Sequence, residues 1–148
     1  MKKKKEKVLV IVSGYFNPVH SGHISMFREA RELGNLFVIV NSDKQVELKG
    51  SVPFMEEQER LEIINSIKYV NKAIRAIDED GTVCSTIKLV SKMFEGYHII
   101  FANGGDRKEG DVPEEKICKE LGIEMAYNIG GEKTQSSSWL LERVKQTA

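Results

Sequence analysis

The sequence lacks any run of apolar residues long enough to cross a membrane. A transmembrane helix needs about 20 consecutive apolar residues, and the chain of 148 residues contains no such run. The apolar stretch Val8 to Val12 is also too short for the central region of a secretory signal peptide. These absences predict a protein without a membrane partner, and we expect a cytoplasmic location.

Cysteine is scarce, and the charges of the two signs cancel. Cys84 and Cys118 are the only cysteines and show no CxxC spacing, so no disulfide framework is expected. Lys plus Arg and Asp plus Glu each number 22, for a formal net charge of +0. A chain without an overall field is not expected to bind nucleic acid. Residues 1–7 are the local exception and predict a solvated basic tail, with a phosphate-binding or membrane-binding arm as the alternative.

What the sequence does have is a regular alternation of apolar runs and amphipathic segments. Short, continuous, β-branched runs are typical of parallel strands that are covered on both faces. We expect strands at 8–12, 36–40, 72–77, 98–102 and 123–127. We expect helices at 21–33, 55–67, 82–94 and 113–121, and from about 136 onwards, with a polar loop at 42–53. This order predicts one domain over residues 8–148.

The expected fold is α/β, a Rossmann-like doubly wound fold with a parallel five-stranded sheet. In such sheets ligands bind beyond the carboxyl ends of the strands, at the point where the strand order reverses.

The segment between the first strand and the first helix carries the strongest functional signal. It reads Ser-Gly-Tyr-Phe-Asn-Pro-Val-His-Ser-Gly-His over residues 13–23. Gly14 permits a sharp turn and the close approach of a ligand, and the start of a helix attracts anions. His20 and His23 are three residues apart, so both rings can project from one side of the helix. Two imidazoles there can donate hydrogen bonds to a phosphorus centre as its negative charge grows.

Other interpretations of the two histidines exist. They could cap the helix, lie at the surface, or supply two ligands of a zinc site, although His98 and the cysteines lie elsewhere in the predicted fold.

Residues 14–23 resemble the HxGH signature of the cytidylyltransferase-like nucleotidyltransferase superfamily. Within it, nearly the whole chain is similar to glycerol-3-phosphate cytidylyltransferases and heptose-1-phosphate adenylyltransferases, with residues 27–34 and 40–43 continuing the match. The resemblance implies transfer of CMP or AMP from CTP or ATP to a small phosphorylated acceptor, a polyol or sugar phosphate, with release of pyrophosphate. It also implies Mg²⁺ held mainly by substrate phosphates, with no metal ligands from the protein, and a homodimer.

The resemblance also assigns roles to individual residues. It implies that His20, His23 and Lys49 are catalytic. The implied nucleotide-binding residues are Ser13, Gly14, Tyr15, Phe16, Gly22, Gly104, Gly105, Asp106, Ser136, Ser137 and Ser138. The implied ligands of the acceptor phosphate are Asn17, Arg60 and Arg107.

Each of these roles has a simpler structural alternative. Lys49 could be solvated, and Arg60 could pair with Glu56 or Glu57 on its own helix. The Gly-Gly-Asp sequence at 104–106 could be an ordinary turn, and the serines at 136–138 could be helix caps.

The segment at residues 133–138 departs from the family pattern. Gln135 stands where the family has an apolar residue, no arginine precedes it, and Lys133 could substitute only as a point charge. The alternative function is therefore a catalytically inactive, nucleotide-binding regulatory module. A dinucleotide oxidoreductase is disfavoured because no GxGxxG follows the first strand, and a class I aminoacyl-tRNA synthetase would need a longer chain.

Overall fold

The computed structural model describes residues 7–104, 110 and 112–130. Predictions for the other residues lie outside this range. They include most of the basic tail, the loop with Gly105, Asp106 and Arg107, and the closing segment with Ser136, Ser137 and Ser138.

Strands and helices alternate along the described chain. The strands are β1 (Val8–Gly14), β2 (Asn35–Val40), β3 (Lys72–Arg75), β4 (His98–Gly104) and β5 (Glu124–Ile129). The helices are α1 (Ser21–Leu33), α2 (Asp43–Leu48), α3 (Glu57–Asn65), α4 (Cys84–Met93) and α5 (Glu115–Leu121).

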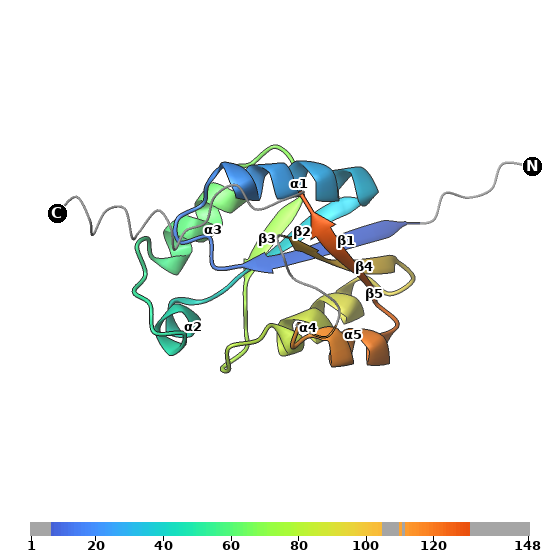
Figure 1. Cartoon of the computed structure of the whole chain (residues 1–148). Helices are drawn as coiled ribbons and strands as arrows, with labels where there is room; N and C mark the ends of the chain where they lie inside the picture. Colours follow the sequence, from blue (N-terminus) through green and yellow to red (C-terminus); the bar gives the residue numbers. More distant parts are fainter. Residues whose placement is uncertain (1–6, 105–109, 111, 131–148) are drawn as a thin grey trace, which may run out of the picture.

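The strands form one parallel sheet in the order β3-β2-β1-β4-β5 (Figure 1). The chain first moves outward from β1 to β3 and then returns to β4 on the other side of β1. The strand order therefore reverses between β1 and β4, which is where a doubly wound sheet binds its ligands.

Helices cover both faces of the sheet, as Figure 1 shows, with α1 on one side and α4 and α5 on the other. Phe27 and Ala30 of α1 and Ile64 of α3 pack with Val10 and Val38 on the first face. On the second face, the buried residues include Ile11, Phe37, Ile87, Val90 and Cys118. Alternate residues of β1 and β2 therefore serve two apolar layers, which explains why these strands are apolar throughout.

The structure confirms the predicted Rossmann-like fold and corrects its details. All five strands and the four predicted helices that fall within the described residues are present, with bounds shifted by a few residues. The prediction of a loop throughout 42–53 is wrong, because α2 occupies its first part. Ser42 caps this helix by accepting a hydrogen bond from the Gln45 amide at 3.2 Å. Only Gln45 and Val46 of α2 are buried, so the helix has too little apolar periodicity to be recognised.

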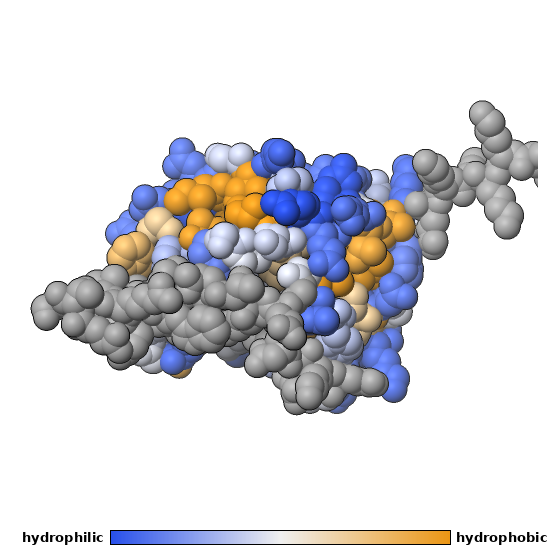
Figure 2. Space-filling view, turned by 45° about the horizontal axis from the view of Figure 1, so that its top comes forward, coloured by the Kyte–Doolittle hydropathy of each residue, from blue (hydrophilic) through white to orange (hydrophobic). Residues whose placement is uncertain are grey.

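The surface in Figure 2 is mixed, with apolar patches lying between strongly hydrophilic residues. Among the described residues, no helix is both long and apolar enough to span a membrane.

Candidate active site

The loop between β1 and α1 is shaped from inside by an aromatic side chain. Phe16 is 2 % exposed and has a positive φ of 50°, an uncommon conformation for a residue other than glycine. Its ring packs edge-on against His23, with the ring centroids 4.8 Å apart, and also contacts the ring of Phe27. The Phe16 ring faces the core, so any contact of this residue with the nucleotide would come from its backbone, and its nucleotide-binding role stays a prediction.

Gly14 is needed for packing within the protein. A Cβ atom at this position would lie 2.8 Å from Cζ of Phe16, closer than real Cβ contacts. The close approach that the sequence assigned to a ligand is thus made by the chain's own aromatic ring. The neighbouring Ser13 and Tyr15 are half-buried at the carboxyl end of β1.

The two histidines form a pair at the start of α1. Their rings are stacked, with centroids 3.8 Å apart and an interplanar angle of 29°. Nδ1 of His20 accepts a hydrogen bond from the Gly22 amide, and Nδ1 of His23 accepts one from the His20 amide, both at 3.1 Å. A nitrogen that accepts cannot carry the proton, so each neutral ring has its proton on Nε2 and can donate from there.

The sequence left helix capping and a role in phosphate chemistry as alternatives for the two histidines, and these contacts allow both. His20 is the N-cap of α1, and it caps the helix through its side chain. The capping hydrogen bond is made by Nδ1 of His20 and orients the ring. It does not involve Nε2, the atom to which we assign the chemistry. Both rings are half-buried, at the carboxyl end of β1 and at the positive end of a helix dipole.

Asn17 fastens a second loop to the histidine loop. Its Nδ2 donates to the carbonyl oxygen of Val52 at 2.9 Å. Its Oδ1 accepts from the amides of Phe54 and Met55 at 2.6 and 3.3 Å. The residue is only 4 % exposed, so its side chain holds the segment before α3. The predicted contact of Asn17 with the acceptor phosphate is not tested by these contacts.

Arg60 of α3 is buried among backbone carbonyls. Its NH1 donates to the carbonyl oxygens of Tyr15 and Asn41, each at 2.7 Å. Its Nε donates to the carbonyl oxygen of Met55 at 2.9 Å, and NH2 pairs with Asp43 at 2.7 Å.

The side chain of Arg60 is 0 % exposed, so the described contacts give it a role inside the protein, and its predicted contact with the acceptor phosphate stays a prediction. Four hydrogen bonds to protein acceptors use the guanidinium fork that was expected to hold phosphate oxygens. Arg60 joins the ends of β1 and β2 to the start of α3, and it does not pair with Glu56 or Glu57.

Lys49 lies beside the histidine loop. Its Nζ is 3.9 Å from the centroid of the Tyr15 ring, a cation–π contact. Lys49 is exposed and caps the end of α2. The fold thus brings Lys49 to the loop that carries His20 and His23, and its catalytic role stays a prediction.

Gln45 is a buried residue that the sequence analysis missed. Its Oε1 accepts from the Ser42 amide and the Asn41 side chain, and its Nε2 donates to the carbonyl oxygens of Asp80 and Thr82, both at 2.8 Å. It connects α2 to the loop after β3. The Ser-x-x-Gln spacing of residues 42–45 is a capping-box pattern, and it is the signal that could have indicated both this helix and the special position of Gln45.

The loop after β3 is stabilised by its own acidic side chains. Asp78 accepts hydrogen bonds from the amides of Ser85 and Thr86 at the start of α4. The pKa of Asp80 is lowered because the hydroxyl and then the amide of Thr82 donate to its carboxylate. Burial raises the pKa of the Cys84 thiol, which disfavours a reactive thiolate at this edge of the sheet.

At the end of β4, Gly104 is in close contact with α1. A Cβ atom there would lie 2.7 Å from Sδ of Met26 and 3.2 Å from the carbonyl oxygen of Ile129. Gly104 therefore lets α1 and β5 approach the strand that neighbours β1. Its predicted contact with the nucleotide, like that of Gly22, is not tested by these contacts.

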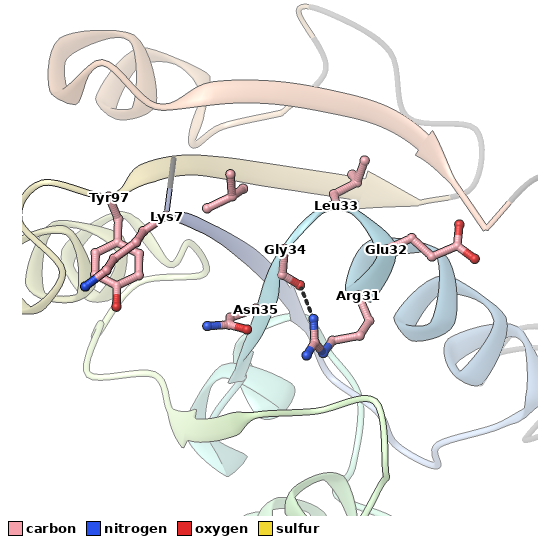
Figure 3. A pocket seen from close by; sticks show the side chains of 8 residues that line it. Lys7, Arg31, Glu32, Leu33, Gly34, Asn35 and Tyr97 are labelled. Atoms are coloured by element: carbon pink, nitrogen blue, oxygen red, sulfur yellow. Dashed lines mark hydrogen bonds between the residues drawn. The ribbon is translucent and has the colours of Figure 1, made fainter. Parts of the chain in front are cut away.

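A groove at the opposite end of the sheet has a different character. Lys7, Arg31, Gly34 and Tyr97 line part of a space of about 620 Å³ at the amino ends of β1 and β2 (Figure 3). Arg31 donates to the carbonyl oxygen of Gly34, and Lys7 lies over the Tyr97 ring. None of the predicted catalytic residues lines this groove.

Comparisons with known proteins agree with the fold and identify the family. The profile of the cytidylyltransferase-like family matches residues 11–139. An FAD synthase from Thermoplasma acidophilum is 36 % identical over 117 residues, covering 78 % of this chain and 77 % of the relative. An ethanolamine-phosphate cytidylyltransferase from Arabidopsis thaliana is 30 % identical over 105 residues, which is 70 % of this chain but only 24 % of the relative.

A solved structure of a lipopolysaccharide core biosynthesis protein from Thermoplasma volcanium has the same fold, with a TM-score of 0.66 and 29 % identity. The match covers 82 % of this chain and 93 % of that structure. The matched residues 11–139 include the histidine loop and every strand except the first residues of β1. The chain therefore belongs to the cytidylyltransferase-like family and is a nucleotidyltransferase.

Proposed function

We propose that this nucleotidyltransferase joins AMP from ATP to the phosphate of FMN and releases pyrophosphate. FAD consists of AMP joined through a pyrophosphate linkage to FMN, so an FAD synthase carries out this transfer. The relative that supports the proposal is 36 % identical and is matched over 77 % of its own length. The resemblance seen in the sequence left CTP or ATP open as donor and suggested a polyol or sugar phosphate as acceptor.

The observation that carries the proposal is the histidine pair. The Nδ1 atoms of His20 and His23 both accept hydrogen bonds from backbone amides, and these contacts fix the orientation of the two stacked rings. The pair lies at the carboxyl end of β1, next to the point where the strand order reverses. Donors held in fixed positions act where transition-state charge develops, without having to reorganise during the reaction.

The reaction needs no general base in this arrangement. An oxygen of the acceptor phosphate is already an anion and attacks the α-phosphorus of the triphosphate. The bond from the α-phosphorus to the oxygen bridging to the β-phosphorus breaks, and pyrophosphate leaves with the electron pair. His20 and His23 stabilise the negative charge on the α-phosphoryl oxygens, and Lys49 neutralises a reacting phosphate.

Mg²⁺ would accompany the triphosphate. Within the part of the chain that the structure describes, no three His, Cys, Asp or Glu side chains are grouped to hold a metal ion. Mg²⁺ often keeps several waters and binds to substrate phosphates with few protein ligands. The residues at the site fit an ion brought in by ATP, which would neutralise the charge of the leaving pyrophosphate.

The remaining roles follow the family resemblance. We infer that Ser13, Gly14, Tyr15 and Gly22 contribute backbone groups to the nucleotide site, together with Gly104. Gly105, Asp106, Arg107, Ser136, Ser137 and Ser138 keep their proposed roles. A homodimer located in the cytoplasm is part of the same proposal.

The decisive experiment measures pyrophosphate release with each nucleoside triphosphate against FMN, polyol phosphates and sugar phosphates. We expect ATP with FMN to give the highest kcat/KM. His23→Ala should lower kcat by about 10²–10³, as loss of a comparable oxyanion donor does. His98→Ala is the matched control and should retain activity. His98 lies at the start of β4, at the amino end of the sheet, 3.5 Å from Glu124.

Full turnover in His23→Ala would contradict the catalytic assignment. Nucleotide binding in calorimetry without any pyrophosphate release would instead support the inactive regulatory module.

A further inference from the structure

The segment between α2 and α3 exposes large apolar side chains beside the candidate active site. Val52 is 75 % exposed and Phe54 is 60 % exposed. Leu48, at the end of α2, is 56 % exposed. Single exposed apolar residues are normal in soluble proteins, but a gathering of them in one short segment commonly marks a binding surface.

The backbone of this segment is held in place, even though its side chains are exposed. Asn17 binds the Val52 carbonyl and the Phe54 and Met55 amides. The Ser51 amide donates to the carbonyl oxygen of Val46. Pro53 fixes its own φ and restricts Val52. A ligand that binds here therefore meets a surface that is already ordered, so little conformational entropy is lost on binding.

The same contacts connect the segment to the reacting groups. Asn17 belongs to the loop that ends in His20, three residues further on. Lys49, which begins the segment, lies on the ring of Tyr15 in that loop. Arg60 joins Met55, at the end of the segment, to the Tyr15 carbonyl. The segment with Val52 and Phe54 is thus connected by hydrogen bonds and a cation–π contact to the loop that carries the histidine pair.

We propose that Val52 and Phe54 form a subsite for a flat aromatic ring system of the acceptor, whose phosphate lies near Lys49 and the histidines. The proposal rests on the function proposed above and specifies how the acceptor is selected. A polyol or sugar phosphate has no apolar surface for Val52 and Phe54 to bury. The tricyclic ring of FMN has two apolar faces, and an aromatic side chain can stack on either of them.

The test compares an acceptor that has the ring with one that lacks it. FMN and ribitol 5-phosphate share the polyol phosphate, and only FMN carries the ring. The double variant Val52→Ser/Phe54→Ser should raise the KM for FMN about tenfold, while the KM for ATP and kcat stay within about twofold of the wild type. With ribitol 5-phosphate the variant should behave like the wild type.

Met93→Ser is the matched control. Met93 is 56 % exposed, but it lies at the end of α4, near the amino ends of the strands. Its replacement should leave the KM for FMN unchanged. Circular dichroism of each variant should show the same folded spectrum, because the replaced side chains contribute little buried surface.

A binding measurement separates failure of the subsite from failure of the proposed function. Binding to the protein raises the fluorescence anisotropy of the flavin, so FMN can be titrated without turnover. Pyrophosphate release with FMN that is unaffected by the double variant would overturn the subsite and leave the function intact. FMN binding that requires Val52 and Phe54, without pyrophosphate release, would support the subsite and contradict the function.

Two further outcomes would overturn the subsite. One is the absence of any FMN binding to the wild type. The other is a wild type that sediments as a dimer and a double variant that sediments as a monomer, with the same affinity for FMN in both. That result would show that a second copy of the chain covers the segment.

Discussion

The two ends of the sheet differ in the way they use polar side chains. The buried polar residues in the described part of the chain are Asn17, Asn41, Gln45, Arg60, Asp78, Thr86, Asn103 and Glu114. Each lies at or after the carboxyl end of a strand, or in the first half of a helix that begins there. At the amino end, the polar contacts are between exposed or half-buried groups, such as Lys7 with Tyr97 and His98 with Glu124.

This difference shows how the site is stabilised. A buried polar group is tolerated only when its hydrogen-bonding capacity is satisfied, and at the carboxyl end the partners are mainly backbone groups of loops. Those loops carry the polar groups that we propose to contact substrate. Apolar side chains could hold the loops in place only if they replaced those polar groups. Buried side chains such as Arg60 and Gln45 instead fix the loops by donating hydrogen bonds to their backbone carbonyl groups.

The largest expected effect on stability comes from removing the buried arginine. Arg60→Ala should lower the free energy of unfolding by about 3 to 5 kcal/mol, because three carbonyl groups and Asp43 lose their partner together. Urea unfolding followed by circular dichroism measures the change.

The matched control is Arg31→Ala at the other end of the sheet. Arg31 is exposed and makes one hydrogen bond, to the Gly34 carbonyl, so its replacement should cost no more than about 0.5 kcal/mol. Equal losses in the two variants would remove the contrast between the ends.

The next largest effect is expected for the buried glutamine. Gln45→Ala should cost about 2 kcal/mol, because the carbonyl groups of Asp80 and Thr82 are left without its Nε2 donor. Gln58→Ala, on the exposed side of α3, should change the free energy of unfolding by less than about 0.5 kcal/mol. If Gln45→Ala were equally neutral in urea unfolding, the loop after β3 would not depend on this connection.

The smallest expected effect on the free energy of unfolding comes from a thiol buried in the apolar core, and it depends on pH. Burial, and then the charge of Glu114, raises the pKa of the Cys118 thiol from its ordinary value of 9.0 to about 12. The unfolded chain therefore releases this proton first, so the contribution of the thiol to stability is complete below about pH 9 and is lost as the pH rises toward 12.

Urea unfolding at about pH 8 and about pH 10 tests this expectation. Cys118→Ala will lower stability at both pH values by opening a cavity, but it should lose less of its remaining stability between them. The same pH slope in both proteins would show that another group causes it.

The sequence was sufficient for the sheet and for the histidine pair, because both depend on local patterns. Strands β1 and β2 are mainly continuous apolar runs, and the hydrogen bonds to Nδ1 of His20 and His23 come from within residues 20–23. A four-residue segment that determines its own geometry can be recognised wherever it occurs.

The roles of Arg60 and Asn17 could not be obtained in this way. Arg60 contacts groups 17, 19 and 45 residues away, and Asn17 binds a segment 35 residues later. An arginine that binds phosphate and one that binds carbonyl groups look identical in a sequence. Only the tertiary structure shows which acceptors surround the guanidinium.

The contact between Gly14 and Phe16 bears on how this enzyme could be redesigned. Any side chain placed at position 14 would collide with the protein's own ring before it met a substrate. In a library that varies position 14 alone, variants would therefore lose activity because they fold poorly, and this loss could be mistaken for a catalytic effect. Positions 14 and 16 need to be varied together, with a smaller residue at 16, for the mouth of the site to be reshaped.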